Sequence, residues 1–155
     1  MNRTILALSA IAFAIPAVAE DTMTMTNIIE LGQETWSPNN AVPPGMGLMM
    51  IYGNPTQPAS FIFRAKIPPG YKLPPHTHPD ARVVTVLKGT YYSGVGTEFD
   101  EGKLRAFPAG SFYATPGNTP HFSATRDEEV VIQEMGTGPG TGMTYVHPQD
   151  DPRSH

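Results

Sequence analysis

Glycine and proline are spread densely along this chain, and they constrain its fold more than any other feature. The 155 residues include 15 glycines and 17 prolines, whereas the two together usually make up roughly 12% of a protein. Both residues break helices, which argues against a helical bundle. Short strands joined by many turns remain, and these are typical of an all-β sandwich or barrel.

The short apolar segments between these breakers predict where the strands lie. Alternating or β-branched apolar residues favour strands at 48–52, 61–66, 82–87, 91–93, 103–107, 111–115, 122–125 and 130–135. One more strand is expected near Ile28–Leu31, in a polar and turn-rich lead-in, and one helical turn near Glu98–Leu104. The strands follow one another at short spacing, so they are expected to form a single β domain.

Charge and cysteine content exclude several classes of function. The formal net charge is −4 at pH 7, and there is no cysteine. A general binder of nucleic-acid backbones needs a basic surface, so nucleic acid is excluded as a partner. Without cysteine the chain has no disulfide, no thiolate ligand for a metal and no cysteine nucleophile.

The first 19 residues predict a secretory signal peptide. Arg3 gives a positive start, Ile5–Ile15 is apolar, and Ala17-Val18-Ala19 has the small-residue pattern of a cleavage site. The apolar run is shorter than the ~20 residues that a membrane-spanning helix needs. No membrane insertion is therefore expected after cleavage. The signal has a bacterial style, so the mature protein is expected in the periplasm or outside the cell.

Three of the histidines are spaced so that they can act together. His76 and His78 are two residues apart, so in an extended strand both side chains point to the same face. His121 follows a Pro-Gly turn and can reach the same place from another strand. Neutral imidazole binds Zn, Cu, Fe and Ni, and three protein ligands with an open position are the usual arrangement of a catalytic site. The alternative for the His76–His78 pair is two hydrogen-bonded surface histidines.

The residues around this pair resemble the first sequence motif of the cupin family, G-x5-H-x-H-x3-E-x6-G. Gly70, His76, His78 and Gly89 stand at the intervals of the motif. One residue departs from it, because Arg82 stands where the family has glutamate.

A later segment resembles the second cupin motif, G-x5-P-x-G-x2-H-x3-N. Gly110, Pro116 and His121 match it, whereas Asn118 replaces the second glycine and Thr125 the final asparagine. Asparagine adopts the left-handed turn conformation more readily than most residues, so the first replacement is mild.

The resemblance covers roughly residues 45–146 and implies a double-stranded β-helix, the cupin jelly-roll barrel. It divides the chain into a signal peptide (1–19), an N-terminal lead-in with a strand arm (20–45), a cupin domain (46–146) and a C-terminal tail (147–155). It also implies that His76, His78 and His121 are ligands of a divalent transition metal, which could be Fe, Mn, Zn, Ni or Cu. By analogy with small cupins, a homodimer is expected.

Arg82 occupies the position of the fourth family ligand, and a guanidinium cannot ligate a metal. In one interpretation the histidines keep the metal, while Arg82 binds an anionic substrate or a nearby carboxylate. In the other the metal is lost, and Arg82 replaces its charge. A divalent ion and an arginine repel each other strongly unless a carboxylate intervenes. Asp80 is the nearest candidate, as a mediator or an auxiliary ligand, and a solvated turn residue is its alternative role.

Two classes of function remain open for this chain. The first is an exported metal-dependent enzyme of dioxygenase, isomerase or lyase type that acts on a small molecule, with Arg82 and Tyr113 as substrate-binding candidates. The second is a non-catalytic module that binds or senses a small ligand or a metal. For Tyr113 the alternative is a core residue with its hydroxyl in water. A structural dimer with a vestigial pocket is a third hypothesis. A fold alone does not select among these.

Overall fold

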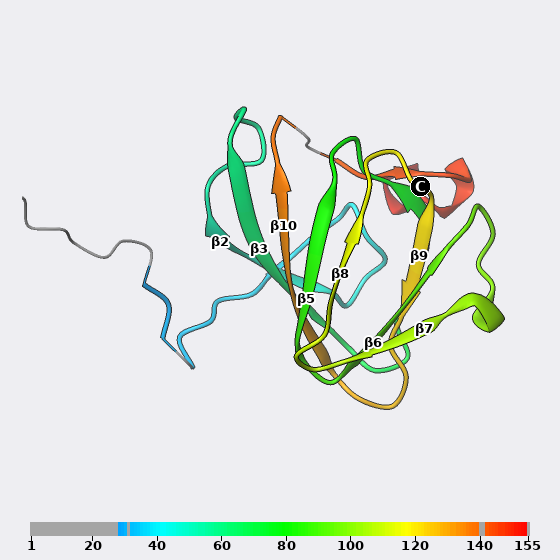
Figure 1. The fold of residues 1–155 in the computed structure, drawn as a ribbon, viewed down its shortest axis with the longest axis horizontal. Coiled ribbons are helices and arrows are strands. Elements are labelled where there is room, and N and C mark those ends of the chain that lie inside the picture. The colour runs from blue at the N-terminus through cyan, green and yellow to red at the C-terminus, as the bar shows by residue number, and fades with distance from the viewer. Residues whose placement is uncertain (1–27, 31, 140–141, 155) are drawn as a thin grey trace, which may run out of the picture.

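The structure is a computed structural model that describes residues 28–30, 32–139 and 142–154. Its strands form two antiparallel sheets that face each other in a jelly-roll β-barrel (Figure 1). The fold class expected from the sequence is thereby confirmed. The signal peptide predicted at residues 1–19 lies outside the described residues. In the part of the chain that is described, no helix is long and apolar enough to cross a membrane.

The first sheet has six strands in the order β1-β2-β3-β10-β5-β8. Their bounds are Ser37–Pro38 (β1), Gly47–Tyr52 (β2), Ser60–Ile67 (β3), Val130–Thr137 (β10), Arg82–Lys88 (β5) and Phe112–Thr115 (β8). β10 pairs with both β3 and β5, so the centre of this sheet joins the two halves of the chain.

The second sheet has five strands in the order β11-β4-β9-β6-β7. Their bounds are Thr144–Tyr145 (β11), Lys72–Thr77 (β4), His121–Ala124 (β9), Thr90–Val95 (β6) and Arg105–Pro108 (β7). Three short 3-10 turns complete the described elements: η1 (Glu101–Lys103), η2 (Pro148–Asp150) and η3 (Pro152–Ser154). β9 lies between β4 and β6 and therefore holds the middle of this sheet.

Side chains that point inward from both sheets form the core. Buried residues alternate with less buried ones along the first part of β5 and of β10, as the period of a strand requires, and Val84, Val86 and Ile132 are at most 4% exposed. Val42 from the lead-in and Met46, which directly follows the lead-in, belong to the same core. The lead-in is therefore packed on the barrel and contributes to its interior.

Most expected strands are present close to their predicted bounds, and the helical turn expected near Glu98–Leu104 is η1. The strand expected near Ile28–Leu31 is wrong, since residues 28–30 are not in a strand. β4 is missing from the sequence prediction, because Pro74-Pro75 reads as a breaker. The register of β4 with β9 shifts between Leu73 and His76. The prolines thus lie at an irregularity, where a missing N–H does not interrupt a regular ladder.

The turn before His121 is tied to the segment that carries His78. Asn118 has a φ of 58°, so it adopts the left-handed conformation that the motif assigns to glycine. Its backbone N–H donates to the carbonyl of His78 over 2.7 Å. Asparagine therefore adopts here the conformation that the motif needs, as expected from the sequence. The hydrogen bond joins the segments that carry the two motifs.

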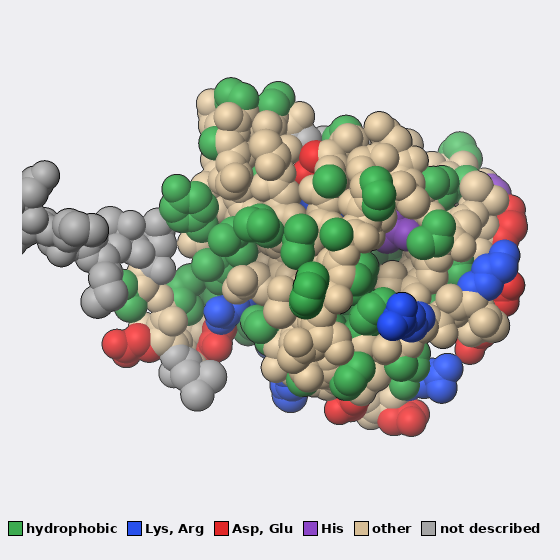
Figure 2. Space-filling view, in the orientation of Figure 1, with side chains coloured by type: hydrophobic (Ala, Val, Ile, Leu, Met, Phe, Trp, Pro, Cys, Tyr) green, Lys and Arg blue, Asp and Glu red, His purple; other side chains and the backbone are tan. Residues whose placement is uncertain are grey.

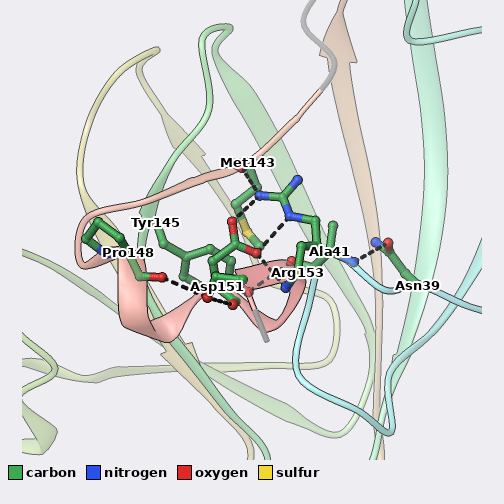
Figure 3. A network of polar contacts seen from close by, with 8 residues as sticks. Asn39, Ala41, Met143, Tyr145, Pro148, Asp151 and Arg153 are labelled. Atoms are coloured by element: carbon green, nitrogen blue, oxygen red, sulfur yellow. Dashed lines mark hydrogen bonds and ion pairs between the residues drawn. The ribbon is translucent and has the colours of Figure 1, made fainter.

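Strand β11 is tied to the lead-in, and the last C-terminal turn is tied to the segment that precedes β11 (Figure 3). The hydroxyl of Tyr145 donates to the carbonyl of Ala41 over 3.0 Å. Arg153 pairs with the carboxylate of Asp151 at 2.7 Å and donates from Nη2 to the carbonyl of Met143 over 3.1 Å. Since Ala41 and Met143 both line the interior cavity, this network fixes part of the cavity wall.

Candidate metal centre

The three histidines predicted as ligands come together inside the barrel. His76 lies near the end of β4, and His78 lies just beyond that strand. His121 is the first residue of β9 and the direct partner of His76 in the β4–β9 pairing. Each of the three offers a ring nitrogen, and these atoms all lie within 4.8 Å of one another. The geometric prediction made from their spacing is therefore met.

Each ring is held by a hydrogen bond from its Nδ1 to a backbone carbonyl. The acceptors are Pro74 for His76 at 2.8 Å, Gly142 for His78 at 3.2 Å and Thr119 for His121 at 2.9 Å. A carbonyl can only accept, so each Nδ1 carries the proton and each Nε2 keeps its lone pair. Metal-binding histidines are commonly oriented in this way.

Burial keeps these imidazoles neutral, which is the form that binds a metal. Desolvation is the largest cause in each case: it lowers the pKa of His76 well below its usual value and that of His78 to about 4. It also lowers the pKa of His121. The neighbouring positive charge of Arg82 lowers all three pKa values further. The three nitrogens are thus available as neutral donors at pH 7.

The imidazoles face a cavity of about 250 Å³ between the sheets. Most of its wall is apolar, from Val42, Met46, Leu48, Phe61, Phe63, Ala65, Leu73, Val84, Ile132 and Met143. Polar groups that also line it include Arg82, Tyr91, Tyr113, Ser123 and Glu134. The cavity can accept a small organic molecule next to the three histidines.

Arg82 lies between two buried carboxylates. Its Nε is 2.9 Å from Oδ2 of Asp80, and its Nη1 is 2.8 Å from Oε1 of Glu134. All three side chains are at most 12% exposed. Asp80 is therefore not a solvated turn residue, which corrects that alternative. Arg82 thus has the carboxylate partners that a buried arginine close to a metal site requires.

Gly136 lets the ion pairs approach the neighbouring strand. A Cβ at this position would overlap Oδ2 of Asp80 and lie 3.0 Å from Cδ of Arg82. The N–H of Thr137 donates to the same Oδ2 over 3.1 Å. Any larger side chain at residue 136 would therefore displace the network.

Glu134 is the residue that the sequence analysis missed. Burial raises its pKa, against the effect of Arg82, which lowers it. The alternation of side chains along β10 could have indicated this role. Val130 and Ile132 point inward, and residue 134, two positions further on, lies on the same face of the strand. A glutamate on the inward face of a strand is unusual and indicates a partner or a function.

Two tyrosines contribute hydroxyl groups to the wall of the same cavity. Tyr91 is buried and donates to Oγ of Ser123 over 2.6 Å. Tyr113 lines the cavity, packs on Phe107 with ring centroids 4.5 Å apart, and makes a side-chain hydrogen bond with Ser93. Burial raises the pKa of both tyrosines, so they are neutral donors at pH 7.

Residues 63–136 match the family model described as the cupin domain. Among curated proteins, no sequence matches this chain. Solved structures with a similar fold include the polyketide cyclase RemF from Streptomyces resistomycificus. That match has a TM-score of 0.67 and 15% identity, and it covers 83% of this chain and 90% of the cyclase.

Two further structures show the same likeness. KdgF from Halomonas sp. has a TM-score of 0.56 and 21% identity, with 74% of this chain and 94% of KdgF covered. The structure of the DMSP lyases RdDddP and RnDddQII has a TM-score of 0.53 and 16% identity, with 63% of this chain covered. This chain spans 51% of that lyase chain, about half its length. At these identities the likeness shows the fold alone.

Proposed function

Because this chain is a small cupin-domain protein, we propose that it is a metal-dependent enzyme that acts on a small organic molecule. The observation that carries the proposal is the convergence of His76, His78 and His121, each with Nδ1 bonded to a backbone carbonyl, so that Nε2 is the atom with a lone pair for a metal. The proposed reaction is of the dioxygenase, isomerase or lyase type.

The donor set fits a divalent transition metal. Three neutral imidazoles suit Fe, Mn, Zn, Ni or Cu, and three protein ligands leave room for a further ligand. Such a metal, when bound, supplies a Lewis acid that polarises an oxygen atom of the substrate. The chain itself fixes the three rings through the carbonyls of Pro74, Thr119 and Gly142.

The wall of the cavity favours a mostly apolar substrate over a sugar acid. Each buried hydroxyl of a sugar needs a hydrogen-bond partner, and leaving one without a partner costs about 1–3 kcal/mol. Aliphatic and aromatic side chains form most of the wall and offer no such partners. A compact apolar body loses nothing there and gains from leaving water.

Arg82 and Glu134 are proposed to set the charge of the site. Two carboxylates surround one guanidinium, so this buried cluster carries a formal charge of −1 when both acids are ionised. That charge offsets part of a divalent cation next to it. Tyr113 lines the same space, and its neutral hydroxyl is a candidate donor to the substrate.

The proposal includes export and a homodimer. Support for export comes from the signal-peptide pattern of residues 1–19. Support for the dimer comes from apolar side chains on the outer face of the six-stranded sheet, where Phe112 is 73%, Met135 43% and Leu87 42% exposed. Exposed apolar groups gathered on one face indicate an association surface.

Cobalt substitution tests the metal site without knowledge of the substrate. The chain freed of metal is titrated with Co²⁺, and its visible absorption is followed with and without azide. We expect saturable bands at one equivalent that change when azide enters an open position. His121→Gln should lose the bands, and the control His147→Gln should keep them. Absence of any band in the unsubstituted chain would contradict the proposed function.

A further inference from the structure

A second hollow reaches the histidines from the side of the barrel. This side groove, of about 490 Å³, is lined by residues of β6, β7 and β8 together with Thr119 and His121. Tyr113, Thr115 and His121 line both the groove and the apolar cavity, so the two hollows adjoin beside the candidate metal centre. Figure 2 shows a hollow in this face, with a histidine at its back and a basic side chain at its edge.

Arg105 stands in this groove at the start of a row of stacked groups. Its guanidinium lies 5.4 Å from the ring centroid of Phe107, and the Phe107 ring is 4.5 Å from that of Tyr113. Tyr113 in turn forms part of the cavity wall. Two packed aromatic rings therefore connect an exposed cation with the wall of the cavity that the histidines face.

Arg105 has a guanidinium that forms no ion pair within the described part of the chain. Its neighbour in the groove, Lys103, lies 3.7 Å from Asp100, and the buried Arg82 has two carboxylate partners. Of these three cations, Arg105 is the one that lines the groove and has no carboxylate partner among the residues that the structure describes.

We propose that the site takes a small amphipathic anion, whose apolar body fills the cavity and whose single anionic group pairs with Arg105 in the side groove. This inference rests on the proposed function for the end of the molecule that faces the histidines, and it names the class of substrate. An anion placed at Arg82 would meet the negative charges of Asp80 and Glu134. An anion at Arg105 meets a guanidinium with its donors available, which is the stronger pairing.

The inference is tested with a matched pair of probes and a matched pair of variants. The probes are 1-hexanesulfonate and 1-hexanol, because a sulfonate is a weak ligand for zinc and will not compete for the metal. The variants are Arg105→Gln and Arg126→Gln, since Arg126 also stacks on an aromatic ring, that of Tyr92 at 4.3 Å, but does not line the groove. Binding to the zinc-loaded chain is measured by calorimetry.

We expect the unsubstituted chain to prefer the sulfonate, and Arg105→Gln to weaken sulfonate binding by about 5-fold or more with hexanol unchanged. Arg126→Gln should change neither probe. Added salt should reduce the preference. An unsubstituted chain without the preference, an Arg105→Gln chain that keeps it, or an equal loss in Arg126→Gln would overturn the inference. Zinc affinity is measured separately: failure to bind zinc contradicts the proposed function, while the sulfonate comparison can still be read without metal.

Discussion

His76 and His121 are partners across the β4–β9 pairing, and their ring centroids lie 4.2 Å apart. The two residues come from different cupin motifs, so their contact depends on the correct register of two strands that are distant in the sequence. A displacement of β4 along β9 would separate the rings. The candidate metal centre therefore exists only in the folded barrel, and metal binding is expected to stabilise the fold.

Acid is expected to destabilise the metal-free protein through its buried histidines. The pKa of His78 falls from 6.5 to about 4 in the folded state, so folding favours its neutral form. This stabilisation is fully present above pH 6.5 and is lost as the pH falls toward 4. A pKa unit corresponds to about 1.4 kcal/mol, and 1 kcal/mol shifts the Tm of a domain of this size by roughly 2–4 °C.

Thermal unfolding of the metal-free chain between pH 7.5 and 4.5 measures this effect. His78→Gln serves as the control, because it removes one of the groups that titrate. Its Tm should fall less steeply with acid than that of the unsubstituted chain. Identical slopes for the two proteins would contradict a neutral, buried His78.

The spacing of residues in the sequence was sufficient to predict that the three histidines converge. It was not sufficient to predict the ion pairs of Arg82. A period of two places His76 and His78 on one face, and the motif intervals bring in His121. The partner of Arg82 on β10 depends on the pairing of β5 with β10, which only the folded sheet sets. Glu134 could have been suspected from its parity in the strand, but its contact with Arg82 could not.

Replacing Arg82 by methionine is expected to be strongly destabilising. The substitution leaves Asp80 and Glu134 buried and close together without their counterion. Loss of one member of a buried ion pair typically costs about 3–5 kcal/mol. The free energy of unfolding is measured in urea for Arg82→Met, Glu134→Gln and the double variant.

The double variant should lose less stability than the sum of the two single variants, because the groups act on each other. Lys88→Met is the matched control: its pair with Glu129 is largely exposed, and its loss should cost about 1 kcal/mol or less. Equal and additive effects of Arg82→Met and Glu134→Gln would argue against the network.

The outer face of the six-stranded sheet is expected to hold two copies together. Phe112 is 73% exposed on the edge strand β8. If the dimer interface covers this position, a glutamate placed there would be buried without a partner for its charge. Phe112→Glu should therefore give a monomer by size-exclusion chromatography with light scattering. Val95→Glu, at an exposed position of the other sheet, should leave the dimer intact. A monomeric unsubstituted chain at micromolar concentration would refute the homodimer.

Export is tested by the N-terminus of the protein recovered from a Gram-negative host. Cleavage after Ala19 should leave Glu20 as the first residue of the periplasmic protein. Ala19→Arg should block cleavage and retain the longer chain, as judged by N-terminal sequencing and intact mass. Recovery of an uncleaved chain from the cytoplasm in both cases would show that residues 1–19 are not a signal peptide.

Elemental analysis of the purified chain tests the central claim most directly. We predict about one divalent transition metal ion per chain, with the metal lost in His76→Gln and His121→Gln. His147→Gln should keep it, because that side chain lies by Glu98 away from the three histidines. A chain that holds no metal even after loading with zinc or iron, or one that keeps its metal when His76 and His121 are both replaced, would contradict the account.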